Sequence, residues 1–153
     1  MPPLLSCLLG RRLCEDPLRE DHWTFRDKCA SLVGDICRKY GSVYATLIPR
    51  ISRTLLKTLV DGEKPLTCHY GAIVGIIALG RQAIDALLLP HIEAYLNALT
   101  PSESTEITAD QVRVKKALSD AMSLWLAGCT EPLTDEEGQQ KARVEALHAH
   151  CQQ

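Results

Sequence analysis

The chain has 153 residues, a hydrophobic fraction of 46% and a formal net charge of −2, which fits one ordinary globular domain without the overall basic character of a nucleic-acid binder. No stretch approaches the roughly 20 uninterrupted apolar residues that cross a bilayer, so we expect no membrane span. Seven cysteines, an odd number with no Cys-x-x-Cys motif, favour a reduced intracellular protein over a disulfide framework.

The first two predicted helices span residues 3–14 and 22–40. Pro17 breaks the polar connection between them, and Asp21 stands where an N-cap residue is expected. Gly41 is expected to end the second helix as a C′ glycine does. Apolar spacings of three and four in this helix predict one inward face, made of Phe25, Cys29, Leu32, Val33, Ile36, Cys37 and Tyr40.

The third predicted helix, 44–61, contains Pro49, which either kinks it or marks its true first turn. After a turn, Thr67 is expected to cap a fourth helix over 68–79. That helix is apolar on nearly all sides, which predicts burial on more than one side.

Glycines stand four residues apart within the fourth helix, at Gly71 and Gly75. Glycine costs up to ~1 kcal/mol in a helix interior, so we expect these two to permit the close approach of a neighbouring helix. Gly80 is expected to close this helix.

A fifth helix is predicted over 81–99 with Pro90 inside it, followed by a polar linker at 100–108. Thr108 is expected to cap a sixth helix, 109–127. Thr134 and Glu137 form a possible capping box for a seventh helix over 135–151, which Gly138 and low apolar content predict to be weak or frayed. The expected organisation is therefore a repeat region at 1–99, the linker, and a further helix pair at 109–153.

A short sequence pattern that contains proline recurs along the chain. Pro3, Pro49 and Pro90 are each followed two residues later by Leu or Ile and six residues later by Leu. A period in the forties is typical of α-helical repeat arrays. We predict an all-α fold, a HEAT-repeat α-solenoid of antiparallel helix pairs with about seven helices, in which the prolines are kinks that set curvature. The first repeat is truncated, so we expect a fragment of a longer protein or a truncated gene model.

Several short runs follow one another in a definite order. They are Leu13-Cys14, Asp21-His22-Trp23-Thr24-Phe25-Arg26-Asp27, Ile36-Cys37, Arg50-Ile51-Ser52-Arg53-Thr54-Leu55, Tyr70-Gly71-Ala72-Ile73-Val74-Gly75, Leu79-Gly80 and Leu87-Leu88-Leu89-Pro90. In order and spacing these runs resemble the C-terminal HEAT-repeat domain of the TBP-associated factor six family over about residues 3–99, with little match beyond Thr100. His69 stands where the family often has Arg, and Phe25 where it has Leu.

The resemblance implies a non-enzymatic scaffold of a nuclear TFIID or SAGA subunit, which acts in RNA polymerase II transcription initiation and preinitiation complex assembly. The implied partners are other subunits, with weak or no direct DNA contact, no cofactor and no small-molecule substrate. The alternative is a generic HEAT- or armadillo-type adaptor in another intracellular assembly. A histone fold upstream of Met1 would decide for the transcription role.

Arg50, Arg53 and Lys57 form one basic stripe on the third helix because their spacing is i, i+3, i+7. Three interpretations remain open: a solvated face, a site for an acidic partner segment, and a contact to the DNA backbone. Exposed His22 and Trp23 are further candidates for partner binding. We expect Asp21 to act as a cap and Arg26, beside Asp27, to pair with a carboxylate of a neighbouring repeat.

Catalytic and metal sites find little support in the sequence. Cys68 and His69 are adjacent in a helix and so do not face each other, which favours packing over a thiol–imidazole pair. His148, His150 and Cys151 lack the four well-spaced ligands of structural zinc. No Gly-rich phosphate loop is present, because Gly71 and Gly75 lie inside a helix and no Lys follows. We therefore expect no catalytic, cofactor-binding or metal-binding residues.

Overall fold

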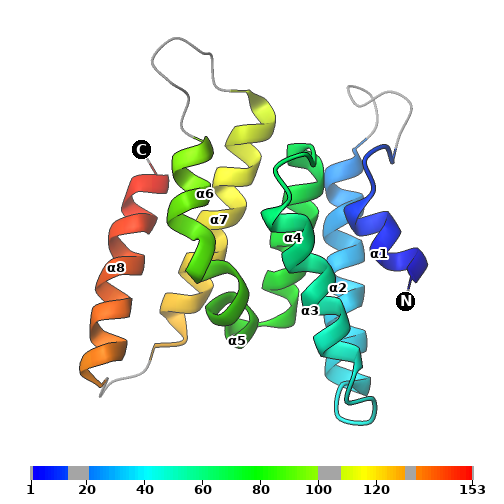
Figure 1. Ribbon diagram of the computed structural model, residues 1–153, viewed down its shortest axis with the longest axis horizontal. Coiled ribbons are helices and arrows are strands. Elements are labelled where there is room, and N and C mark those ends of the chain that lie inside the picture. The colour runs from blue at the N-terminus through cyan, green and yellow to red at the C-terminus, as the bar shows by residue number, and fades with distance from the viewer. Residues whose placement is uncertain (1, 14–20, 100–107, 130–133, 153) are drawn as a thin grey trace.

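The computed structural model describes residues 2–13, 21–99, 108–129 and 134–152. Within these residues the chain forms helices and turns only, so the all-α prediction is confirmed there. The helices stand side by side in a row, with the first and last at opposite ends (Figure 1). They are α1 (Pro2–Leu9), α2 (His22–Tyr40), α3 (Leu47–Val60), α4 (Leu66–Leu79), α5 (Arg81–Ala83), α6 (Ile92–Leu99), α7 (Ala109–Ala127) and α8 (Asp135–Cys151). The predicted linker lies outside the described residues except for Thr108.

Three of the predicted helix caps are confirmed. An Asp21 carboxylate oxygen accepts a hydrogen bond from the Thr24 backbone N–H at 3.0 Å. Thr108 and Thr134 each form a complete capping box at the starts of α7 and α8. These caps satisfy backbone donors that the helix itself leaves unpaired, and their local pattern explains why the sequence reveals them.

Other helix ends differ from the prediction. α1 stops at Leu9, short of the predicted residue 14. α4 starts at Leu66, so Thr67 is already inside it, Pro65 takes the cap position and no side chain caps this end. Gly41 ends α2 in a right-handed conformation with φ −61°, unlike a left-handed C′ glycine. Gly80 does close α4, with a φ of 98° that favours glycine.

α4 is the central helix of the array, because it packs against α1, α2, α3 and α7. This position explains why its sequence is apolar on nearly every side. The predicted close approach at Gly71 is confirmed, since a Cβ built there would lie 2.1 Å from the Leu8 carbonyl oxygen of α1. At Gly75 a Cβ would lie 2.8 Å from a Leu55 methyl of α3, so both glycines let neighbours pack close to the α4 backbone.

The predicted fifth helix is divided into segments around Pro90. After α5, a π-helical turn runs from Ile84 to Leu88 and a 3₁₀ turn from Leu89 to His91. Proline lacks the N–H of the helical ladder and clashes with a carbonyl one turn earlier, which accounts for the widened turn before it. Pro49, in contrast, lies in the first turn of α3, where proline is tolerated, so the second of its two open interpretations holds.

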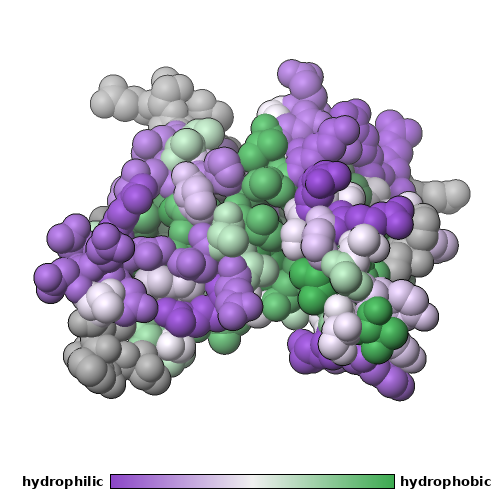
Figure 2. Space-filling view, turned by 60° about the horizontal axis from the view of Figure 1, so that its bottom comes forward, coloured by the Kyte–Doolittle hydropathy of each residue, from purple (hydrophilic) through white to green (hydrophobic). Residues whose placement is uncertain are grey.

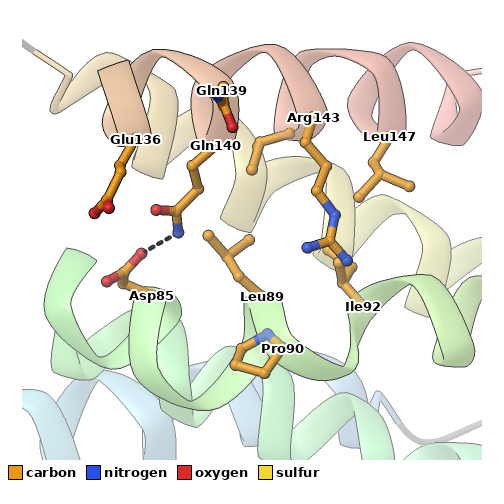
Figure 3. Close-up of a pocket in the computed structure, with 10 residues that line it drawn as sticks. Asp85, Leu89, Pro90, Ile92, Glu136, Gln139, Gln140, Arg143 and Leu147 are labelled. Atoms are coloured by element: carbon orange, nitrogen blue, oxygen red, sulfur yellow. Dashed lines mark hydrogen bonds between the residues drawn. The ribbon is translucent and has the colours of Figure 1, made fainter. Parts of the chain in front are cut away.

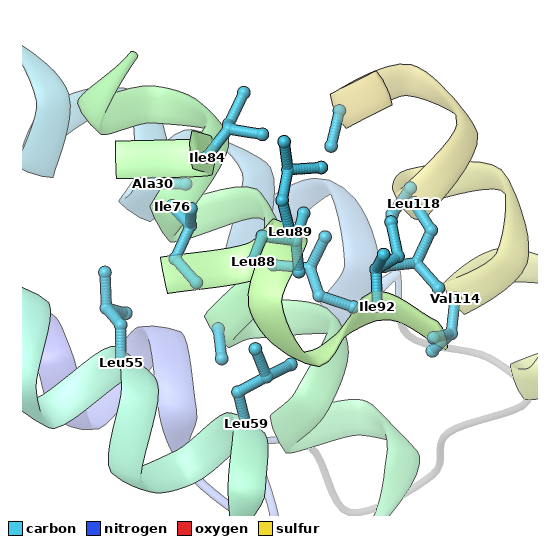
Figure 4. Packing of buried hydrophobic residues seen from close by; sticks show 14 of the residues in the cluster. Ala30, Leu55, Leu59, Ile76, Ile84, Leu88, Leu89, Ile92, Val114 and Leu118 are labelled. Carbon is cyan, nitrogen blue, oxygen red and sulfur yellow. The ribbon is translucent and has the colours of Figure 1, made fainter. Parts of the chain in front are cut away.

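The core runs continuously across the row of helices, from Leu55 and Leu59 of α3 to Val114 and Leu118 of α7 (Figure 4). The predicted inward face of α2 is wrong in part, because Phe25, Leu32 and Tyr40 are 45%, 51% and 41% exposed. The buried face of α2 instead includes Arg26, Ala30 and Gly34, on the side that packs against α1 and α4. Small residues are needed there, since a Cβ on Gly34 would lie 2.5 Å from the Ala78 carbonyl oxygen.

The last helix is better formed than its composition predicts. α8 runs without interruption across Gly138 and packs against α7, with Val144 as its buried residue. The expectation of a frayed helix therefore differs from the structure. Tertiary contact with α7 supplies the stabilisation that the low apolar content of α8 does not.

Candidate interaction surface

A basic stripe is exposed on α3, as its spacing predicts. Arg50, Arg53 and Lys57 all lie on the solvent side, opposite the buried residues Ile51 and Leu55. Within the part of the chain that the structure describes, none of the three makes an ion pair. The charges of these cations are therefore available to a partner, although exposed cations are also common on solvated helix faces.

Exposed apolar side chains cluster in the α2–α3 turn, directly before the basic stripe in the chain. Val43 and Tyr44 are 70% and 62% exposed, and Tyr40 and Ile48 flank them at 41% each. Figure 2 brings this end of the molecule forward and shows apolar surface interspersed with polar residues there. Aromatic and apolar groups next to arginines are typical of the energetically important parts of interfaces. We call the α3 cations and this turn together the α3 surface.

His22 and Trp23 do not belong to an exposed surface, which corrects the expectation that they are exposed. Their exposed fractions are 8% and 9%, and their rings lie against each other with centroids 4.4 Å apart. The Trp23 ring meets the Tyr70 ring edge-on, with centroids 4.9 Å apart. The Tyr70 hydroxyl donates to the Asp27 carboxylate at 2.8 Å, which ties α4 to α2. Burial, together with this carboxylate, raises the pKa of Tyr70.

Arg26 is almost fully buried on α2, beside the end of α1. Its two terminal nitrogens donate to the backbone carbonyls of Leu8 at 2.6 Å and Gly10 at 2.7 Å. The guanidinium thus satisfies carbonyls at the C-terminal end of α1, and its expected pairing with a carboxylate stays a prediction. A cation is favourable at that end, where the helix dipole is negative and carbonyls lack intrahelical partners.

A groove with a volume of about 610 Å³ lies between α8 and the Pro90 segment. Figure 3 shows Gln140 of α8 pointing toward Asp85, to which it donates at 2.8 Å. The Trp125 indole N–H donates to the same carboxylate at 3.1 Å, and Arg143 pairs with Glu93 at 2.7 Å. The hydrogen-bonding groups of these side chains are paired with one another. Their contacts join α8 to the neighbouring helices of the array. Sequence reasoning missed it because its residues come from distant segments.

Three of the described thiols lack the environment of a nucleophile. Burial raises the pKa values of Cys29, Cys37 and Cys151, whereas an activated thiol has a lowered pKa. Cys68 is fully buried. Among the described residues, no group of three or more potential ligands gathers around a metal position, and no helix is both long and apolar enough to span a bilayer.

His69 has partners of its own in the structure. Its Nε2 lies 3.1 Å from the Asp61 carbonyl oxygen, and its Nδ1 lies 2.7 Å from the Tyr95 hydroxyl. A carbonyl can only accept, so Nε2 carries the proton and Nδ1 accepts from Tyr95. His69 thus links the turn before α4 to α6, and burial lowers its pKa.

Comparison with known proteins gives one match to a family, the TAF6 C-terminal HEAT repeat domain, over residues 1–93. "Transcription initiation factor TFIID subunit 6" of Arabidopsis thaliana is 42% identical over 117 residues, which cover 76% of this chain and 21% of that protein. "SAGA complex/transcription factor TFIID complex subunit Taf6" of Schizosaccharomyces pombe is 45% identical over 95 residues, covering 62% and 21%. The human "TAF6-like RNA polymerase II p300/CBP-associated factor-associated factor 65 kDa subunit 6L" is 41% identical over 101 residues, covering 61% and 16%. The chain thus spans about a fifth of the first two relatives' length.

Proposed function

The chain belongs to the TAF6 C-terminal HEAT repeat domain family, and from this membership we propose that it is a non-enzymatic scaffold domain of a TFIID- or SAGA-type transcription assembly. The names of its relatives support this role, since they are subunits of TFIID or of SAGA. The same names support a nuclear location and a part in transcription initiation and preinitiation complex assembly. The raised pKa values of the buried thiols argue against nucleophilic catalysis by those cysteines.

The α3 surface is the proposed contact with another subunit of the assembly. The observation that carries this proposal is that Arg50, Arg53 and Lys57 are exposed without ion partners among the described residues, beside the apolar α2–α3 turn. An acidic segment with apolar side chains complements this surface, because opposite charges guide association and buried aromatic contacts hold the complex. Direct DNA contact is expected to be weak, because the three cations of α3 can neutralise only a few phosphates.

Charge reversal on α3 tests the proposal. The Arg50→Glu, Arg53→Glu double variant is expected to lower recovery of TFIID or SAGA subunits about tenfold when the full-length protein is purified from nuclear extract. The physical reason is that like charges across an interface repel while the fold stays intact, because both side chains are exposed. Subunit recovery is measured by quantitative mass spectrometry.

A matched control is available on other helices. Lys28→Glu with Lys116→Glu changes the net charge by the same amount at two exposed positions, on α2 and α7. This control should leave subunit recovery within about twofold of the unmodified protein, since surface charges away from a contact contribute little. Equal recovery in both double variants, or equal loss in both, would refute a specific role for the α3 surface.

A further inference from the structure

Three helices begin at the same end of the molecule. α2, α4 and α7 all start at the top of Figure 1. A cavity of about 370 Å³ lies among their first turns and includes Thr67 and Ala109 in its lining. The N-terminal end of each helix carries a partial positive charge, so the three dipoles act on this cavity together.

Arginines surround the same cavity. Arg11 and Arg12 follow the end of α1, and Arg113 comes from the first turns of α7. Arg11 also donates to the Glu63 carbonyl at 3.2 Å, which places its guanidinium beside the turn before α4. Among the described residues of the lining, Asp110 is the one carboxylate, so cations outnumber anions in this set. The described lining residues therefore carry a net positive charge, although the whole chain is slightly negative.

A buried polar atom at this cavity lacks a partner. His22 lines the cavity and is only 8% exposed, and its Nδ1 makes no hydrogen bond. An unpaired buried polar nitrogen destabilises the folded state, and a ligand that hydrogen-bonds to it removes that cost. Burial lowers the pKa of His22, so the ring is neutral at pH 7 and can present an Nδ1–H to an anion.

Arg113 is held in place before any ligand arrives. Its guanidinium carbon lies 5.1 Å from the centre of the Trp23 ring, in a cation–π contact. The Trp23 ring is itself fixed against Tyr70. Less side-chain entropy is therefore lost when Arg113 binds an anion. No side chain caps the start of α4, so no side-chain oxygen accepts from its first backbone N–H groups. Such N–H groups at a helix N-terminus can donate to an anion.

We propose that this pocket, the arginine pocket, is an oxyanion site that takes the carboxylate or phosphoryl group of one acidic side chain in a protein segment. A volume of about 370 Å³ suits one side chain and its head group. Asp110 in the lining disfavours a continuous polyanion such as a nucleic-acid backbone. The site rests on the geometry of the pocket and stands whether or not the α3 surface binds a partner.

NMR titration of the 153-residue chain tests the assignment. The ligands are inorganic phosphate, a short peptide with one phosphoserine, the same peptide with glutamate in its place, and the same peptide with unmodified serine. The Trp23 indole N–H signal is expected to move with phosphate and with the phosphoserine or glutamate peptide, while that of Trp125 stays fixed. The relative affinities of the two acidic peptides identify which head group the pocket prefers.

Variants separate the pocket from general charge effects. Arg12→Glu combined with Arg113→Gln should weaken peptide binding at least tenfold, since each removes a charge-assisted contact. Arg12→Glu alone, at an exposed position, retains the test if the double variant folds poorly. Arg53→Glu on α3 is the charge control and should leave binding unchanged. The proposal is overturned if only inorganic phosphate binds, if the serine peptide binds equally well, or if the pocket variants and Arg53→Glu behave alike.

Discussion

Replacing Gly71 by alanine sets helix propensity against tertiary packing. Alanine is favoured over glycine by up to ~1 kcal/mol in a helix interior, so α4 taken alone predicts a more stable protein. In the structure, the new Cβ would lie 2.1 Å from the Leu8 carbonyl oxygen, which is backbone and cannot rotate away. α1 must therefore shift by roughly 1 Å or more to restore ordinary contact.

That shift disturbs the buried guanidinium of Arg26. The Leu8 carbonyl accepts from Arg26 at 2.6 Å and the Gly10 carbonyl at 2.7 Å, and both belong to the segment that must move. Hydrogen bonds to charged groups contribute about 1.5–3 kcal/mol each, so weakening the pair costs about 2–4 kcal/mol. After the propensity gain, Gly71→Ala is expected to destabilise the protein by about 1–3 kcal/mol, which lowers Tm by roughly 3–10 °C.

Urea unfolding followed by circular dichroism at 222 nm measures this change in the free energy of unfolding. Gly138→Ala in α8 is the matched control, because no atom lies within 4 Å of a Cβ built there. That control should stabilise the protein by about 0.5–1 kcal/mol through propensity alone. If Gly71→Ala matched or exceeded the unmodified protein in stability, the close contact between α1 and α4 would be wrong.

Two further predictions concern His69 and the start of α8. Burial lowers the pKa of His69 in the folded state, so the unfolded chain binds a proton at this position more readily. The protein therefore keeps its full stability above about pH 6.5, and loses part of it as the pH falls below the unfolded-state pKa of histidine. His69→Gln should reduce this loss between pH 7 and pH 5 in urea unfolding, and an unchanged pH slope would count against the assignment. Thr134→Ala removes the capping box with Glu137 and should cost about 1 kcal/mol, seen as faster amide exchange in the first turns of α8. Unchanged exchange there would show that packing on α7, and not the cap, holds this end.

Much of the α3 surface could be predicted from the sequence, whereas much of the arginine pocket could not. The exposure of Arg50, Arg53 and Lys57 follows from spacing on one helix, which sequence alone supplies. Val43 and Tyr44 are indicated more weakly by the sequence, as apolar residues in a short turn. No sequence pattern indicates Arg12 and Arg113, because no local spacing relates two arginines so far apart in the chain.

The sequence by itself determined the helical segments, most of their caps and the repeat, because each depends on residues within a few positions or on a simple period. Tertiary structure alone decided which face of α2 is buried. Apolar spacing favours Phe25 and Leu32 for the buried face over Arg26. In the structure, however, the Leu8 and Gly10 carbonyls at the end of α1 satisfy the buried Arg26 guanidinium, and α4 approaches closely where α2 has Gly34. Hydrophobic spacing measures apolar character along one helix, whereas burial depends on the shape and the hydrogen-bonding groups of the neighbours that pack against it.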